Sequence, residues 1–310
     1  MGKKPARRQH YVWRHYLSEW STDNQIYCLF KKKDKIISCD NKNIAIKKDF
    51  YKVTPLKSKE IDLIEKIFIK PLTADRKVIT YNYLKILKNI NFISEDFEKT
   101  INIKDYDNKF KKFLIESEEN YHNQIENGTI KFLEKLILND FSFYENEINS
   151  YYFNFYLSLQ YFRTLRIKEN YLKIIKENKV EEKRLENIWN VIKFIFTINS
   201  TISLSNRSND FNIFIVNNNT IIPFITGDQP IINTYGDYNS SRLLKDNEIE
   251  FYYPISLYKA IIISKDIPVL KNKHILPLDD KNVIKDYNKK ILNASYSQVY
   301  AKNENDFLNV

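Results

Sequence analysis

The segment 150–166, SYYFNFYLSLQYFRTLR, decides the architecture that we expect, because it is apolar or aromatic nearly all round. A helix without a polar face is buried on all sides, so this segment predicts a central helix. On either side of it, from about residue 58 to 200, apolar residues recur at helical spacing and charged residues fill the opposite faces. We therefore expect a bundle of helices around residues 150–166.

Both ends of the chain are predicted to be β-rich. Residues 25–38 indicate a small strand pair, and residues 211–225 form the clearest hairpin, FNIFIV and TIIPFI joined by three asparagines. The other expected elements are strands near 249–253, 259–264 and 297–301, and a helix near 281–292.

This pattern of elements predicts an α+β fold. The helical middle, 58–200, would pack on a mixed or antiparallel sheet formed by the N-terminal and C-terminal β segments. The C-terminal segments make up a β-rich portion, 201–301. Because the sequence shows no internal repeat and no low-complexity linker, we expect a single domain over residues 1–310.

Glycine and cysteine usage excludes several classes of site. The chain has only 4 glycines and lacks both G-x-G-x-x-G and G-x-x-x-x-G-K-[ST]. Backbone cradles for phosphate need such glycines, so Rossmann, P-loop and kinase folds are excluded. Cys28 and Cys39 stand alone, and the 4 histidines show no zinc-ligand spacing. We predict no cofactor, and a divalent metal ion such as Mg²⁺ is the alternative that stays open.

The same sequence indicates where the protein works. No apolar run reaches the 18 or so residues of a membrane span, and the basic start is not followed by the apolar stretch of a signal peptide. Two cysteines without an evident disulfide partner suit a reducing compartment. We expect a cytoplasmic protein that does not enter the membrane.

Positive charge is concentrated near the N-terminus. Residues 1–48 contain 12 basic and 4 acidic side chains, so they carry +8 of the formal net charge of +10. Such a patch attracts phosphate backbones, which makes RNA or DNA an expected partner. A solvated tail that keeps the protein in solution explains the same charge.

The first candidate site lies within this basic region, in the segment RQHYVWRHYL at 8–17. His10 is suited to proton transfer near neutral pH, and Arg14 to neutralising a phosphate or an oxyanion. The alternative is structural: His10 and Tyr11 would anchor the N-terminal segment in the core through satisfied hydrogen bonds.

A second candidate lies in the central segment. Gln160, Arg163 and Arg166 have a spacing that places them along one side of an otherwise apolar helix. A buried guanidinium requires a partner, so Arg163 should meet a carboxylate, an array of carbonyl groups or a ligand phosphate. An ion pair without any role in ligand binding satisfies this requirement equally well.

The third candidate is FITGDQP at 224–230, where a predicted strand ends. A rigid sheet can aim the Thr226 hydroxyl and the Asp228 carboxylate from such a position. Turn formation alone also accounts for Gly-Asp-Gln-Pro. His122 and His274 stand in polar or loop-like contexts, and we expect both on the surface.

These segments together resemble the domain-of-unknown-function family 4238 over about residues 9–301. The resemblance is carried, in order, by HYVWRHYLSEWSTDNQIYCLF, LQYFRTLR, FITGDQPIIN and YNKKILNASYSQVYA. The residues that match the family pattern are His10, Tyr11, Val12, Tyr16, Leu17, Gln160, Arg163, Thr226, Asp228, Pro230, Asn288, Ala294, Val299 and Tyr300. The chain departs from the pattern at Trp13 and Arg14, where Pro and Gln are usual, and at Gly227, where Ser is usual.

The resemblance implies a bacterial or archaeal protein of a family often seen near antiviral-defence genes, and it supplies no reaction. From residue chemistry we predict a defence effector that acts on nucleic acid as a nuclease. The candidate catalytic residues are His10, Tyr11 and Asp228, and the candidate substrate-binding residues are Arg14, Gln160, Arg163 and Thr226. The rival hypotheses are a non-catalytic phosphate-binding sensor, with a buried structural network, and a small-molecule hydrolase.

Overall fold

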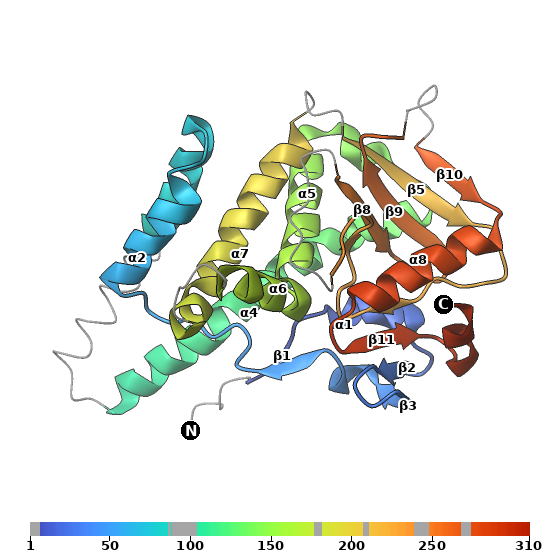
Figure 1. The fold of residues 1–310 in the computed structure, drawn as a ribbon, viewed down its shortest axis with the longest axis horizontal. Helices are drawn as coiled ribbons and strands as arrows, with labels where there is room; N and C mark the ends of the chain where they lie inside the picture. The colour runs from blue at the N-terminus through green and yellow to red at the C-terminus, as the bar shows by residue number, and fades with distance from the viewer. Residues whose placement is uncertain are drawn as a thin grey trace.

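The structure, a computed structural model, describes residues 7–85, 88, 104–176, 182–206, 211–238, 248–267 and 274–310. Its main helices are α1 (Arg14–Leu17), α2 (Ser58–Ile64), α4 (Lys104–Ile137), α5 (Glu147–Phe162), α6 (Leu165–Lys176), α7 (Glu182–Ser205) and α8 (Lys281–Ala294). Residues 74–85 are helical as well. The long helices gather on one side of the molecule and most of the strands on the other (Figure 1).

The strands of the described residues form three sheets. The first pairs β1 (Arg8–His10) with β4 (Ile46–Lys48). The second has the order β10-β5-β9-β8-β7, made of Ile275–Leu278, Asn212–Asn218, Lys259–Ser264, Glu250–Pro254 and Ile232–Asn233. The third has the order β3-β2-β11-β6, made of Lys35–Asp40, Gln25–Phe30, Gln298–Ala301 and Thr226–Gly227.

The third sheet confirms that the two ends of the chain share one sheet. The C-terminal strand β11 pairs with β2, from the N-terminal part of the chain, on one edge and with β6 on the other. The five-stranded sheet is mixed, since β10 runs parallel to β5 and the other pairs are antiparallel. The α+β class is therefore confirmed. The single-domain prediction is not tested directly, although the largest core cluster combines N-terminal, helical and C-terminal residues.

Alternation along β9 places one face of the five-stranded sheet against α4 and α5 and the other face against α8. Ile261 and Ile263 belong to the core beside α4 and α5, whereas Ala260 and Ile262 pack in the core that contains α8. Successive strand residues point to opposite faces, and both faces of this strand are apolar. Figure 1 shows α8 crossing one face of this β-rich side.

The central segment is buried as expected, but it forms two helices. The helix α5 ends at Phe162 and α6 begins at Leu165. Between them, Thr164 accepts a hydrogen bond from the Ile167 N–H at 3.4 Å, the bond of an N-cap residue. The prediction of one helix through residue 166 was wrong at this point. Arg166 consequently leaves the side of Gln160 and Arg163, and it donates to main-chain carbonyl groups of residues 238 and 293–295.

The hairpin predicted at 211–225 is also wrong. Its first half is β5, but β9 and β10 pair with the two edges of that strand, so no edge remains for residues 220–225. The Asn288 side chain instead accepts from the Ile225 N–H and donates to the Pro223 carbonyl. These hydrogen bonds hold residues 223–225 against α8, and the chain then continues into β6 of the four-stranded sheet.

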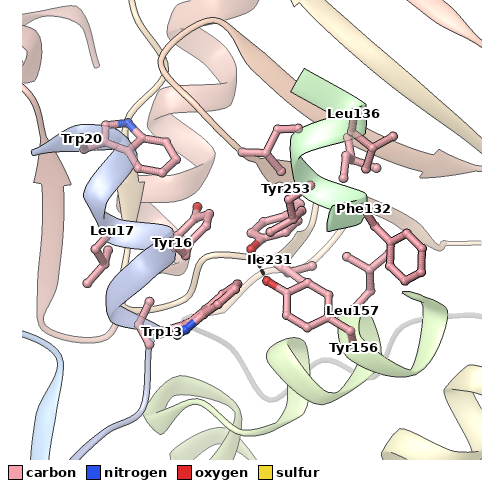
Figure 2. Close-up of a cluster of buried hydrophobic side chains, with 14 of the residues drawn as sticks. Trp13, Tyr16, Leu17, Trp20, Phe132, Leu136, Tyr156, Leu157, Ile231 and Tyr253 are labelled. Atoms are coloured by element: carbon pink, nitrogen blue, oxygen red, sulfur yellow. Dashed lines mark hydrogen bonds between the residues drawn. The ribbon is translucent and has the colours of Figure 1, made fainter. Parts of the chain in front are cut away.

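An aromatic cluster joins the N-terminal segment to α4, α5 and the five-stranded sheet (Figure 2). Tyr16 stacks on Tyr253 with a centroid distance of 5.1 Å, and the Tyr253 and Tyr156 hydroxyl groups are 2.8 Å apart. Trp13 lies edge-on to Tyr156 at 6.2 Å. These contacts fix α1, and with it the residues on either side of Trp13. Among the described residues, no helix combines the length and apolar character that crossing a bilayer requires.

Candidate functional site

A cavity of about 160 Å³ lies where the N-terminal segment meets α4 and the end of α5. The N-terminal part of its lining consists of His10, Trp13, Arg14 and Tyr51, and α4 contributes Glu119, His122, Asn123 and Glu126. Arg163, the C-cap residue of α5, completes it. The α4 residues are spaced i, i+3, i+4 and i+7, so they share one face of that helix.

The inner face of α4 changes from apolar to polar and back again. Ile115 and Leu133 are buried toward its two ends, whereas Glu118, His122 and Glu126 are buried between them. Polar groups are costly to bury unless they find partners. Each of these three has at least one partner on the same or another helix, and we call them and those partners the buried polar network.

One part of this network surrounds Arg163. Its Nη2 donates to Glu126 Oε1 at 2.5 Å, and Gln160 Nε2 donates to the same oxygen at 3.3 Å. Burial raises the pKa of Glu126, and the Arg163 charge opposes that shift. Of the partners expected for Arg163, namely a carboxylate, an array of carbonyl groups or a ligand phosphate, the structure shows a carboxylate, and Gln160 donates to the same group.

The other part joins α4 to α7. Lys193 forms a buried ion pair with Glu118 Oε1, and His122 Nε2 lies 3.3 Å from the same oxygen. Burial raises the pKa of Glu118 and lowers the pKa of Lys193, while each charge offsets part of the effect on its partner. Burial, followed by the Arg163 and Lys193 charges, holds the pKa of His122 well below its ordinary value.

Three buried nitrogen atoms of the lining have no hydrogen-bond partner among the described residues. They are His10 Nε2, His122 Nδ1 and Arg163 Nε. Burial lowers the pKa of His10, and the nearby Arg14 charge lowers it further. The residues that line the cavity thus include one guanidinium donor and two imidazole nitrogens whose bonding capacity the described part of the chain leaves unused, and such groups suit an oxygen-rich ligand.

Of the residues that the sequence singled out, the structure brings His10, Arg14 and Arg163 together around this cavity. Gln160 is one hydrogen bond away, through Glu126. Arg14 is exposed at the rim and Arg163 is 1% exposed. Residues from two of the three candidate segments therefore meet, and no residue of the third segment, 224–230, lines this cavity.

Tyr11, Thr226 and Asp228 are buried outside the cavity lining. Tyr16 contacts the Thr226 hydroxyl at 2.6 Å. Asp228 accepts hydrogen bonds from the Ser297 hydroxyl and from three main-chain N–H groups, those of residues 296–298, at 2.6 to 3.0 Å. These contacts connect β6 to the segment before β11, and the hydrogen-bonding partners of Asp228 are structural.

The structure adds residues that the sequence analysis missed. Glu119, Glu126 and Tyr51 line the cavity, and Glu118 and Lys193 stand behind His122. His122 was expected on the surface, and that prediction was wrong, since it is 1% exposed. Helical spacing alone could have grouped residues 119, 122 and 126. It could not show that this face of α4 is the buried one, because charged residues occupy its other faces too.

The second histidine expected on the surface, His274, is half-buried. Its ring stacks on Phe141 at 4.4 Å, and Nδ1 lies 2.9 Å from the Ile213 carbonyl. Within the described ranges, no three His, Cys, Asp or Glu side chains are grouped so that they could hold a metal ion.

Comparison with known proteins places the chain in a family without assigning it a reaction. Neither the curated proteins nor the solved structures contain a match to it. The sequence model of one family, described as Protein of unknown function (DUF4238), matches residues 8–305 of the 310. This match confirms the resemblance in the N-terminal, central and C-terminal segments. The chain therefore belongs to the DUF4238 family.

Proposed function

We propose that the cavity is the active site of a nuclease-like hydrolase that cleaves phosphodiester bonds in RNA or DNA, and that the protein serves as a cytoplasmic antiviral-defence effector in a prokaryote. The observation that carries the proposal is that His10, His122 and Arg163 line one cavity and that each has a buried nitrogen without a hydrogen-bond partner among the described residues. The defence role rests on the family resemblance alone.

The size of the cavity fits one group of a larger substrate. Pockets for whole drug-sized ligands are about 300 to 1,000 Å³, and this cavity is about 160 Å³. The scissile phosphate of a nucleic acid would enter the cavity, and the rest of the nucleic-acid strand would stay outside. Arg163 Nε and Arg14 would bind the phosphate oxygens, and His10 would transfer a proton as general acid or base.

The two-stranded sheet supplies a path for the substrate. Arg8 lies opposite Lys48, both are exposed, and His10 follows two residues along the same strand. Residues i and i+2 of a strand, and residues opposite each other, share one face. Like charges placed opposite each other destabilise strand pairing, so the stability of the strand pair does not explain why Arg8 lies opposite Lys48. A phosphate backbone bound there would lead to His10.

The cavity lining contains two arginines and two glutamates, Arg14, Arg163, Glu119 and Glu126, so its formal charges balance. Burial raises the pKa of Glu119, to which Gln9 donates a hydrogen bond at 3.3 Å. Attraction of nucleic acid therefore depends on the basic face of β1 and β4, and the lining is left to bind and react with the phosphate that arrives.

The second candidate function is a non-catalytic sensor that binds phosphate or nucleic acid. It is favoured by the hydrogen bonds of Asp228 and by the buried Arg163–Glu126 ion pair, which have the character of structural contacts. In this case the basic face would bind nucleic acid and no bond would be cleaved.

Cleavage of end-labelled single- and double-stranded RNA and DNA by the purified full chain tests the proposal, with and without Mg²⁺. We expect His10→Ala to lower the rate by about 10²- to 10⁴-fold, the usual contribution of a proton-transfer group. Arg14→Ala should mainly weaken substrate binding. His15→Ala is the matched control, because His15 is exposed and outside the cavity lining.

Thermal melting of each variant separates loss of activity from loss of structure. A wild-type level of cleavage by His10→Ala would remove His10 from the mechanism. Steeply salt-dependent binding without cleavage of any substrate would instead support the sensor.

A further inference from the structure

The buried ion pair between Lys193 and Glu118 lies next to His122. Through this contact it can influence the protonation of that histidine. His122 is the link between the cavity and the α4–α7 contact, because it lines the cavity on one side and meets Glu118 on the other. Neither Glu118 nor Lys193 lines the cavity itself.

The His122 ring is held in a fixed orientation. The centroid of the Tyr51 ring lies 4.5 Å from the centroid of the imidazole ring, and the Phe194 ring is stacked on the imidazole with a centroid distance of 6.0 Å. Its Nε2 lies 3.3 Å from Glu118 Oε1, whereas Nδ1 is buried and has no partner among the described residues. The ring of this side chain, which is 1% exposed, therefore has one nitrogen at the carboxylate, while the other nitrogen belongs to a cavity-lining residue and has no protein partner among the described residues.

Lys193 contacts the carboxylate that faces the imidazole ring of His122. It donates to the Oε1 atom that faces His122, and its ammonium group is also 5.1 Å from the centroid of the Tyr51 ring. A lysine charge at this position favours the ionised form of Glu118, which can only accept hydrogen bonds. Nε2 must then be the donor, and Nδ1 of the neutral ring is left with a free lone pair.

We infer that His122 is a catalytic base of the cavity, with Glu118 and Lys193 as positioning residues that hold its proton on Nε2 and present Nδ1 to a bound hydroxyl group. This inference rests on the proposed function and deepens it. In hydrolysis, the oxygen of an attacking water forms a bond to phosphorus while its proton moves to Nδ1. The bond to the leaving oxygen breaks on the opposite side of phosphorus, that oxygen takes up a proton through His10, and the His122 imidazolium releases its proton to solvent after the reaction.

The charged and titratable groups that face His122 keep it neutral before reaction. Arg163 from α5 and Lys193 from α7 disfavour the imidazolium, and Glu118 from α4 is engaged by Lys193. Tyr51 contributes its ring face, and burial raises the pKa of its hydroxyl. A neutral imidazole is the form that accepts a proton from water.

The test uses ¹⁵N-histidine-labelled full chain, in which the 4 histidines are assigned through His→Asn variants. We expect the His122 signals of a neutral ring protonated on Nε2. Inorganic phosphate, which carries a P–OH donor near neutral pH, should shift the Nδ1 signal. Sulfate has no such donor, and it should leave the Nδ1 signal unchanged. A His122 ring protonated on Nδ1, or equal responses to the two anions, would overturn the inference.

Variants connect this arrangement to catalysis. Lys193→Met removes the charge that favours ionised Glu118, so the protonated carboxyl should donate to Nε2 and move the ring proton to Nδ1. His122→Asn should lower kcat by about 10²- to 10⁴-fold with KM within a few-fold of wild type, and His15→Asn should change neither. Unchanged kcat in His122→Asn would also overturn the inference.

The wild-type spectra need no substitution, so they remain decisive even if a variant fails to fold. They also separate the two proposals. Absence of cleavage by the wild-type protein, together with a phosphate-specific shift at Nδ1, would contradict the proposed nuclease and leave the His122 arrangement in place. Cleavage with Nδ1 protonated would contradict the His122 arrangement alone.

Discussion

His122 and Arg163 derive their chemistry from burial and from the groups around them. Each is 1% exposed, and each has one nitrogen bound to a glutamate and another without a partner among the described residues. A residue in this setting is sensitive to any change of charge nearby, because a partner removed from a buried pair leaves an uncompensated charge. The stability of the fold and the chemistry of the cavity are therefore coupled at these two positions.

The depressed pKa of His122 predicts a pH-dependent contribution to stability. In the unfolded chain His122 takes up a proton as the pH falls through about 6.5, whereas the folded protein keeps it neutral to well below that value. The unfolded state then binds more protons, so stability falls as the pH is lowered. The free energy of unfolding of wild type relative to His122→Asn should decline below about pH 6.5, by up to about 1.4 kcal/mol per pH unit.

Urea denaturation of both proteins between about pH 5 and pH 8 measures this difference, which should level off above about pH 7. Taking the difference removes the opposing contribution of Glu126, which does not contact His122 and whose raised pKa favours the folded state at lower pH. A difference that stays constant over the whole range would show that the pKa of His122 is not depressed.

At the level of single elements, local signals are strong where side chains complete the ends of a helix. Asn146 accepts hydrogen bonds from the main-chain N–H groups of Ile148 and Asn149, at 3.1 and 3.0 Å, and so caps α5. Thr164 does the same for α6. Such caps fix where the helix that carries Arg163 begins and ends, and thereby where the guanidinium lies relative to α4.

Removal of the α5 cap should destabilise the protein without affecting the cavity. Asn146 is exposed, so Asn146→Ala removes two hydrogen bonds to the first turn and little else, at a cost of about 1 kcal/mol. Chemical denaturation measures the loss, and Asn146→Asp, which restores an acceptor at the cap position, should recover most of it. Equal stability of all three proteins would show that the cap contributes nothing.

At the scale of the whole molecule, Asp228 connects parts of the chain that are far apart. It follows β6 and binds the segment before β11, the strand that pairs with the N-terminal β2. Gly227 has little room here, because a Cβ atom at this position would collide with Ser295 Oγ. The carboxylate and the close approach of the backbone together hold the joint between the two ends of the chain.

Asp228→Ala should therefore lower the stability of the whole protein. It leaves four donors around a fully buried position without their acceptor, and each buried unsatisfied group costs about 1 to 3 kcal/mol. We expect a loss of at least about 3 kcal/mol by chemical denaturation. The control Asp286→Ala, on the exposed face of α8, should change stability by less than about 0.5 kcal/mol. A wild-type stability of Asp228→Ala would contradict the structural role.

Much of the fold could be predicted from the sequence. Periodicity and turn residues locate β2 and β3, β8 and β9, α8 and β11, and the buried character of residues 150–162. These are local properties, since the spacing of apolar residues along the sequence indicates which face of a helix or strand is buried. The same reasoning identified His10, Arg14 and Arg163 as residues with unusual chemistry, since arginine and histidine are scarce in a lysine-rich chain.

Tertiary structure decided what the spacing does not record. Residues 220–225 have the pattern of a strand, but β9 and β10 already pair with both edges of β5. His122 and Glu126 have the pattern of a solvated helix face, but both are buried. Gln160 and Arg163 compensate the burial of Glu126, and Lys193 pairs with Glu118, the partner of His122. The physical reason is the same in both cases. Strand pairing and the desolvation of charge depend on partners far away in the sequence, and the chain provides those partners only once it has folded.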